Sequence, residues 1–172
     1  MNARSTVTEQ AVAEQAVRPR MSDPTELIPE LATIGGALYK ATGNRSVPRT
    51  TIGLIHLRAG QIVGNTYLTL MHSGLLRKAG ESEERIAAVA SWKDAPFYTA
   101  AERVALELVE AVILPNPRGE RVSDDLYARV AEQYDEKALA TLTVAIGQVN
   151  FFTALAVVGK PLAGVGASGQ WG

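Results

Sequence analysis

Apolar residues recur along most of this chain at intervals of three and four positions, which is the spacing of one face of an α-helix. The pattern is clearest between residues 49 and 63, where Ile52, Ile55, Ala59 and Ile62 follow one another at this spacing. No segment shows a convincing alternation of apolar and polar residues, as a half-buried strand would. The pattern therefore predicts an all-α fold.

Helix-capping residues mark where the predicted helices begin and end. Asp23 followed by Pro24 is an N-cap with proline in the first helical position. This helix is predicted to run toward Leu38, with Gly35-Gly36 as its point of interruption. Later signals bring the total to about seven helices: the break at Gly64-Asn65, the left-handed C-cap Gly80, and the N-caps Ser82 (helix to about Trp92), Thr99, Ser123 and Asp135.

The longest apolar run, from Ala138 to Gly159, is about as long as a bilayer span. It contains Gln148 and Asn150, whose amide groups would be costly facing lipid. We therefore expect this run to be a buried helix of a soluble protein rather than a membrane anchor.

The two ends of the chain differ in composition from the middle. Residues 1–22 have no apolar core, so they do not form a secretory signal; we expect a disordered leader with a transient helix around Thr8 to Val17. Residues 164–172 are rich in glycine and are expected to form a flexible tail. The folded domain is then predicted to span residues 23–163, in a cytoplasmic protein.

The composition limits the classes of function. With 172 residues, 47% hydrophobic, the chain is long enough for one domain with a substantial core. Its net charge of -1 gives no electrostatic reason to expect a nucleic acid or an anionic membrane as partner. It contains no cysteine, which excludes disulfides, thiolate metal sites and cysteine nucleophiles.

One segment, Gly64 to His72, lies in a context that is similar to the active-site helix of the carboxymuconolactone decarboxylase/alkyl hydroperoxidase D family. Further segments add to the resemblance, in the same order, between Glu26 and Val158: Pro48 before Leu54-Ile55-His56-Leu57-Arg58, then Trp92-Lys93-Asp94-Ala95-Pro96, Thr99-Ala100-Ala101-Glu102-Arg103, and Leu142 to Asn150. The resemblance implies an all-α, alkyl hydroperoxidase D-like helical domain. It also implies a homo-oligomer (dimer, trimer or hexamer) with a pocket near the contact between protomers.

The chain departs from the redox members of this family at the positions of their chemistry. Those members carry Cys-x-x-Cys followed four residues later by histidine; here the matching residues are Asn65, Leu68 and His72, and Gly53 stands where they have a glutamate. An amide or an alkyl group cannot replace a thiolate that cycles through a disulfide. We therefore expect no peroxidase activity. The decarboxylase branch, which the chain resembles in keeping this histidine, works without a cysteine pair or a cofactor.

Four residues share one face of the helix that follows Gly64, because they lie three, four and seven positions apart: Asn65, Leu68, Thr69 and His72. The resemblance makes this the pocket face. His72 is the candidate general acid or base, since an unperturbed imidazole has a pKa near neutrality. Asn65, Leu68 and Thr69 would then contact the substrate. The alternative is a partly buried histidine with satisfied hydrogen bonds and no catalytic role.

Three further residues are candidates for substrate binding, each with a structural alternative. Arg58 would bind a substrate carboxylate, or form a salt bridge with Glu102 or Glu107. Tyr67 would donate a hydrogen bond to an oxyanion, or pack against Trp92 or Phe97. Asn150 would be one polar anchor of an aromatic pocket, or a buried amide that caps a neighbouring helix.

Two other groups consist of residue types that can carry chemistry. His56 and His72 offer two zinc ligands, but a third with suitable spacing is not evident, so we expect no metal and interpret His56 as a surface or interface histidine. Glu107 and Glu110 are expected to form a solvated stripe rather than a catalytic pair.

The sequence thus leads to two hypotheses about function. The first is a cofactor-free acid/base enzyme that acts on a small or medium organic molecule by decarboxylation, isomerisation or lactone chemistry, with His72 as proton carrier. The second is a catalytically inactive scaffold that binds a ligand or a protein partner. Replacing His72 should abolish turnover under the first hypothesis and leave binding intact under the second.

Overall fold

The computed structural model describes residues 18–117, 119–166 and 169–171, and in them it contains helices and turns but no strand. The prediction of an all-α fold is confirmed over these residues, which form eight α-helices in place of about seven and a short 3-10 turn. The helices are α2 (Pro24–Leu27), α3 (Glu30–Thr42), α4 (Arg49–Ile62), α5 (Thr66–Lys78), α6 (Glu83–Ala88), α7 (Ala100–Ile113), α8 (Asp124–Gln133) and α9 (Glu136–Gly159); the 3-10 turn η1 is Val89–Ser91.

The first predicted helix is interrupted at a different place from the one expected. Gly35-Gly36 lies inside α3, and the break falls between α2 and α3, at Ile28 and Pro29. A proline inside a helix removes a backbone donor, and the residue before it is pushed out of helical conformation, as the φ of -135° at Ile28 shows. Gly35 packs against α9: a Cβ there would make an ordinary contact, 3.4 Å from the ring of Phe152.

The predicted caps are confirmed. The side chains of Ser82, Ser123 and Asp135 each accept a hydrogen bond from a backbone N–H in the first turn of their helix. Gly80 follows α5 with a φ of 86°, a conformation that glycine adopts without strain. The helix after Ser82 does not continue smoothly to Trp92: α6 ends at Ala88 and η1 completes the segment.

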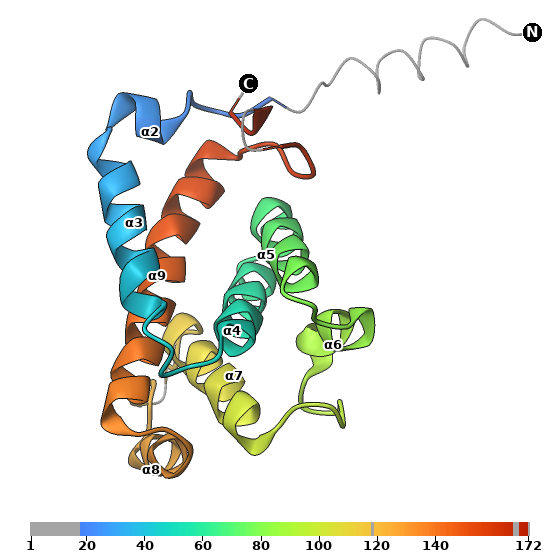
Figure 1. Ribbon diagram of the computed structural model, residues 1–172, viewed down its shortest axis with the longest axis vertical. Helices are drawn as coiled ribbons and strands as arrows, with labels where there is room; N and C mark the ends of the chain where they lie inside the picture. The colour runs from blue at the N-terminus through green and yellow to red at the C-terminus, as the bar shows by residue number, and fades with distance from the viewer. Residues whose placement is uncertain (1–17, 118, 167–168, 172) are drawn as a thin grey trace, which may run out of the picture.

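Helix α4 lies at the centre of the molecule, paired with α5 and in contact with α7 and α9 (Figure 1). Its opposite faces enter two hydrophobic cores. The first core joins α4 to α7, α8 and α9, and the second joins α4 to α5, α6, η1 and α7. Long α9 runs beside α3 along one side of the molecule (Figure 1). This arrangement leaves the faces of α4 and α5 that point to α3 and α9 available to form a site.

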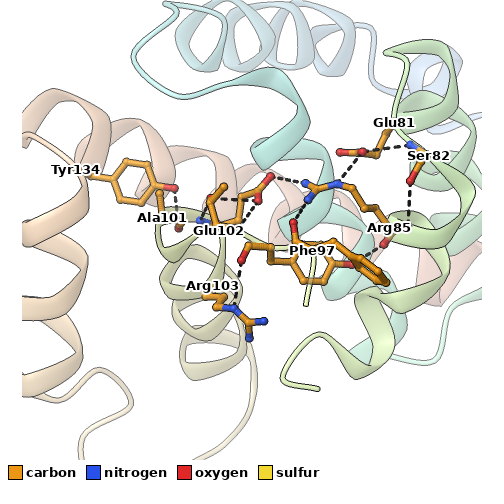
Figure 2. Close-up of polar contacts among 10 residues, drawn as sticks. Glu81, Ser82, Arg85, Phe97, Ala101, Glu102, Arg103 and Tyr134 are labelled. Atoms are coloured by element: carbon orange, nitrogen blue, oxygen red, sulfur yellow. Dashed lines mark hydrogen bonds and ion pairs between the residues drawn. The ribbon is translucent and has the colours of Figure 1, made fainter. Parts of the chain in front are cut away.

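The junction between α6 and α7 is held by a polar network around Arg85 (Figure 2). The Arg85 guanidinium donates to Glu81 at 2.8 Å, to Glu102 at 2.5 Å and to the carbonyl of Phe97. Glu102 and Thr99 form the predicted capping box of α7. The Thr99-to-Arg103 segment, which contributes to the family resemblance, therefore serves the fold here.

The prediction that the longest apolar run is a buried helix is correct only for part of its surface. α9 is long and apolar enough to cross a membrane by length and composition, a test that core helices of soluble proteins also pass, and about a third of its apolar window is buried. Phe151, Val157 and Val158 are exposed on it. Much of α9 thus faces away from the core of the chain.

The described ends of the chain meet at the C-terminus of α9 (Figure 1). The backbone N–H of Arg20 donates to the carbonyl of Gly159 at 2.7 Å, and Leu162 donates to Gln170 at 2.7 Å. The indole of Trp171 lies so close to Gly159 that a Cβ there would be 2.6 Å from it. The first 17 residues, including the transient helix expected around Thr8 to Val17, lie outside the described residues. The expected flexibility of leader and tail stays a prediction.

Candidate active site

A cavity of about 370 Å³ lies between α3, α4, α5 and α9. Most of its lining is aliphatic or aromatic, including Ile52, Leu68, Met71 and Phe152. Its polar lining residues are Thr42, Arg49, His56, His72 and Gln148. A mostly apolar cavity with a few convergent polar groups is the usual form of a small-molecule site.

Both histidines of the chain line this cavity and lie next to each other. His56 comes from the middle of α4 and His72 from the facing side of α5. Their ring centroids are 5.1 Å apart and the ring planes meet at 61°. Both residues are buried, with 9% of His56 and 7% of His72 exposed. The expectation that His56 is a surface or interface histidine is therefore wrong within this chain.

His56 is fixed by a hydrogen bond to α9. Its Nε2 lies 2.9 Å from the backbone oxygen of Ala145. Since a carbonyl oxygen only accepts hydrogen bonds, Nε2 must carry the proton, and Nδ1 of the neutral ring is left as an acceptor. The bond therefore sets both the tautomer and the orientation of this ring.

Burial keeps both rings neutral at neutral pH. It lowers the pKa of His56 to about 4, although the hydrogen bond to Ala145 opposes the shift. Burial also lowers the pKa of His72 to about 3, and the neighbouring His56 lowers it further. A pKa near neutrality for His72, on which the sequence argument relied, is thus not what the cavity provides.

The ring nitrogens of His72 are not sealed from solvent. Within the described part of the chain, no hydrogen bond joins a protein group to either nitrogen, and the sealed side-chain polar atom without a partner is Gln61 Oε1. The nitrogens of His72 are therefore accessible from the cavity that this residue lines. A ligand in the cavity can hydrogen-bond to His72 without first displacing a protein group.

Arg49 supplies a positive charge at the cavity, a feature that the sequence analysis missed. Its guanidinium stacks on the ring of Tyr39, 4.1 Å from the centroid, and no carboxylate among the described residues pairs with it. The helical spacing that selected the α5 face would have found it on α4, because Arg49, Ile52 and His56 share one face. Gly43 leaves room for this side chain, since a Cβ there would be 2.5 Å from Arg49 Nη2.

The four residues expected to share the pocket face divide into two pairs. Leu68 and His72 line the cavity. Asn65 instead caps α5: its Oδ1 accepts from the N–H of Leu68 at 2.9 Å, and its Nδ2 donates to the carbonyl of Ala156 at 3.3 Å. The hydroxyl of Thr69 donates to the carbonyl of Asn65 at 2.9 Å. Asn65 and Thr69 thus hold the start of the helix and do not reach the cavity.

Arg58 lies on another side of α4, away from the cavity. It forms a salt bridge at 2.7 Å with Glu110, and not with either of the two glutamates expected. The indole N–H of Trp92 donates to the same carboxylate at 2.7 Å, and Lys93 lies 3.2 Å from it. The prediction that Glu110 belongs to a solvated stripe is therefore wrong. Glu107 is more exposed and pairs with Arg129 at 2.6 Å.

Two further candidates lie outside this cavity. Tyr67 packs against neither aromatic residue expected; its hydroxyl donates to Gln170 Oε1 at 2.8 Å, and its ring lines a second, neighbouring cavity together with Trp171. Asn150 is exposed on α9 and lines a separate hollow formed with α7 and α8. The structure thus does not bring Asn150 together with His72.

Among the described residues, no third potential metal ligand lies beside His56 and His72. Over the described ranges, no group of three His, Cys, Asp or Glu residues gathers at a distance suitable for one metal ion. Two imidazoles, one of which already donates to Ala145, do not make the three protein ligands of a typical catalytic zinc site. The arrangement is suited instead to hydrogen bonding by neutral imidazoles.

This chain belongs to the carboxymuconolactone decarboxylase family, whose family model matches residues 29–111. The uncharacterized protein YdfG of Bacillus subtilis is 37% identical over 132 residues, which are 77% of this chain and 88% of that protein. The uncharacterized protein YnjA of Escherichia coli is 39% identical over 69 residues, which are 40% of this chain and 36% of that protein. Membership in this family indicates enzymatic potential toward small molecules.

Solved structures confirm the alkyl hydroperoxidase D-like fold. One is a protein of unknown function from Agrobacterium tumefaciens, suggested to be the antioxidant defence protein AhpD, with a TM-score of 0.77 and 28% identity over 87% of this chain and 100% of that one. Another is the debrominase Bmp8, with a TM-score of 0.70 and 18% identity over 85% of this chain and 76% of that one. At that identity, Bmp8 shows the shared fold alone.

Proposed function

We propose that this protein is a thiol-independent, cofactor-free acid/base enzyme in which His72 accepts and returns a proton on a small organic acid. One observation carries the proposal: the unpaired ring nitrogens of His72 are open to an apolar cavity that also contains a cation, Arg49. The fold is known to accommodate a small organic molecule, since a cysteine-to-alanine variant of Bmp8 was solved in complex with 2,3,4-tribromopyrrole.

The substrate must supply a negative charge, because no carboxylate of the described residues lines the cavity. With a pKa of about 3, the neutral His72 imidazole is a weak base, so a proton acceptor of useful strength requires a nearby negative charge. A substrate carboxylate attracted by Arg49 would bring that charge into the cavity and raise the pKa of His72. The apolar lining would keep water away from the reacting carbon.

The proton and the electron pair are both accounted for in this transfer without a cofactor. A proton leaves the carbon next to a carbonyl group, its electron pair stays on the substrate as an enolate, and a nitrogen of His72 binds the proton. In an isomerisation the proton returns to another carbon. In a decarboxylation, His72 first binds a proton from solvent while the substrate carboxylate is bound, and the electron pair left by departing carbon dioxide takes up that proton. His56, held by Ala145, fixes one wall of the site and opposes a second positive charge.

A ligand-binding scaffold is the second candidate, and the low pKa of His72 favours it. An imidazole that stays neutral over the physiological range can serve as a hydrogen-bonding partner without ever moving a proton. Both candidates use the same cavity and the same anionic ligand. They differ in whether a bound acid exchanges a carbon-bound hydrogen.

Hydrogen exchange in heavy water separates the two candidates. We would incubate a panel of small keto acids and unsaturated acids with the protein in D2O and follow loss of the C–H signal by proton NMR. Enzyme-dependent exchange of at least one acid is expected, and His72→Gln should slow it by a factor of about 10²–10⁴, the usual contribution of a general base.

Thr69→Val is the matched control, because Thr69 lies on α5 one turn from His72 but bonds only to the carbonyl of Asn65. This variant should exchange at nearly the wild-type rate. Exchange that survives in His72→Gln would refute the role of His72. Acids that bind at the cavity but never exchange would establish the scaffold instead.

A further inference from the structure

A second cavity of about 250 Å³ lies next to the first, between α2, α5 and α9. Its floor is apolar, formed by residues such as Leu155, Ala156 and Pro161. One wall is the indole of Trp171, held against Gly159 where the two described ends of the chain meet. Trp171 thereby forms part of the cavity wall near the end of α9.

The two cavities share part of their lining. Leu68, Met71 and Phe152 belong to both, so these three side chains are the partition between them. Met71 is a flexible, unbranched side chain that can change rotamer at little cost. The partition is therefore a set of side chains and not a layer of backbone.

The cationic residue Arg49 and the aromatic residue Trp171 line opposite ends of the pair of cavities. Arg49 and Ala79 belong to the first cavity, near the C-terminal end of α5, and Tyr67 and Trp171 belong to the second, at the N-terminal end. The twelve positions from Tyr67 to Ala79 correspond to about 18 Å along a helix. His72 lies between the two ends.

The second cavity contains a carboxylate, which disfavours an anionic group there. Asp23, the N-cap of α2, lines it and is bonded to the backbone and hydroxyl of Thr25 at 2.8 and 2.7 Å. Its carboxylate, together with burial as the larger cause, raises the pKa of Tyr67. A ligand with one negative end therefore has a preferred direction, with its anionic group at Arg49 and its apolar part toward Trp171.

We propose that the two cavities are consecutive parts of one binding site for an elongated amphipathic carboxylic acid, with the carboxylate beside Arg49 and the apolar chain passing Met71 to end against Trp171. The inference rests on the proposed function for the anionic end of the ligand, but it does not require proton transfer. It makes Trp171, Leu155 and Ala156 the residues that select the length of the substrate.

Calorimetric titration with hexanoate, octanoate, decanoate and dodecanoate, each below its micelle concentration, tests the proposal. The affinity is expected to rise about three- to fourfold for each added methylene that leaves water. With six more methylenes, dodecanoate should therefore bind roughly 700- to 4000-fold more tightly than hexanoate. Arg49→Gln should weaken all four acids by a similar factor and leave the matching primary alcohols unaffected.

A variant with a larger side chain in the second cavity tests whether that cavity holds the end of a long acid. Leu155→Trp should leave hexanoate binding within about twofold and reduce the advantage of dodecanoate to less than about tenfold. The matched control is Val157→Trp, an exposed position of the same helix, which should change neither. Trp171→Ala, near the end of the chain, tests the same wall without enlarging a packed residue, and should weaken dodecanoate selectively.

Two results would overturn the proposal. One is an affinity that does not increase with chain length in the wild-type protein. The other is a loss of affinity in Leu155→Trp or Trp171→Ala that is equal for short and long acids. If the length dependence holds while no acid exchanges hydrogen in D2O, the elongated site stands and the proposed chemistry falls.

Discussion

His56 and His72 lie edge to face, 5.1 Å apart, and each makes a positive charge on the other more costly. Both are buried, and the carbonyl of Ala145 fixes His56 as the neutral ring that donates from Nε2. The pair can therefore hold one proton far more readily than two. In a family whose redox members use two cysteines at this helix, this chain presents two imidazoles at the cavity.

The histidine pair should make the protein less stable as the pH falls. The unfolded chain binds protons on both histidines below about pH 6.5, whereas the folded chain, with pKa values of about 4 for His56 and about 3 for His72, stays unprotonated. The unfolded state thus binds more protons, and the free energy of unfolding should decrease by roughly 1.5 kcal/mol per histidine between pH 6.5 and 5.

Urea unfolding at a series of pH values measures this dependence. Carboxylates remain largely ionised between pH 5 and 6.5, so the histidines dominate the change in that window. His72→Gln should remove about half of it. A free energy of unfolding that stays constant over the window, or that rises as the pH falls, would show that the rings are not kept neutral by the fold.

The two arginines of α4 should behave in opposite ways. Arg58→Gln leaves the buried carboxylate of Glu110 without its guanidinium partner, and should lower the free energy of unfolding by about 2–3 kcal/mol. Arg49→Gln loses only the stacking contact with Tyr39, worth less than about 1 kcal/mol. Equal effects of the two substitutions in urea unfolding would contradict the assignment of Arg58 to the fold and Arg49 to the cavity.

Asn65 should act on stability and not on the ligand. Asn65→Ala removes the N-cap of α5 and the bond to Ala156, and is expected to cost about 1–2 kcal/mol in thermal or urea unfolding. Asn65→Asp keeps the acceptor for the N–H of Leu68 and should cost less. Both variants should bind carboxylic acids as the wild type does, since Asn65 does not line the cavity; a binding defect in Asn65→Asp would place this residue in the site after all.

The protein should not consume peroxides with thiol reductants. Reduction of a peroxide in this fold's redox members begins with attack by a cysteine thiolate, and this chain has no cysteine. The rate of hydrogen peroxide or tert-butyl hydroperoxide consumption with dithiothreitol should equal the rate without protein. A rate that increases in proportion to protein concentration would reveal a peroxidase chemistry that does not depend on sulfur.

Local signals in the sequence predicted the elements of this fold well. The N-caps Ser82, Ser123 and Asp135 and the C-cap Gly80 are all used as expected, because capping depends on residues only a few positions apart. The interruption at Pro29 has an equally local cause, but Gly35-Gly36 also disfavours a helix and was predicted as the break in its place.

The residues of the site could be predicted only where helical spacing alone determines which side chains line the cavity. The α5 periodicity correctly placed Leu68 and His72 on the cavity. Periodicity could not show that the side chain of Asn65, which is also on that face, caps α5 and so does not reach the cavity. Partners far apart in sequence were missed as well: Glu110 for Arg58, and Gln170 for Tyr67, depend on how α7 and the tail pack, which periodicity does not contain.

The ring nitrogens of His56 and His72 can be observed directly by ¹⁵N NMR of histidine-labelled protein, with His72→Gln to assign the two rings. At pH 7 both rings should be neutral, and His56 should carry its proton on Nε2. Adding decanoate should shift the nitrogens of His72 toward the protonated form and change those of His56 much less. A His72 ring that is already charged in the free protein, or that does not respond to any bound acid, would contradict the account.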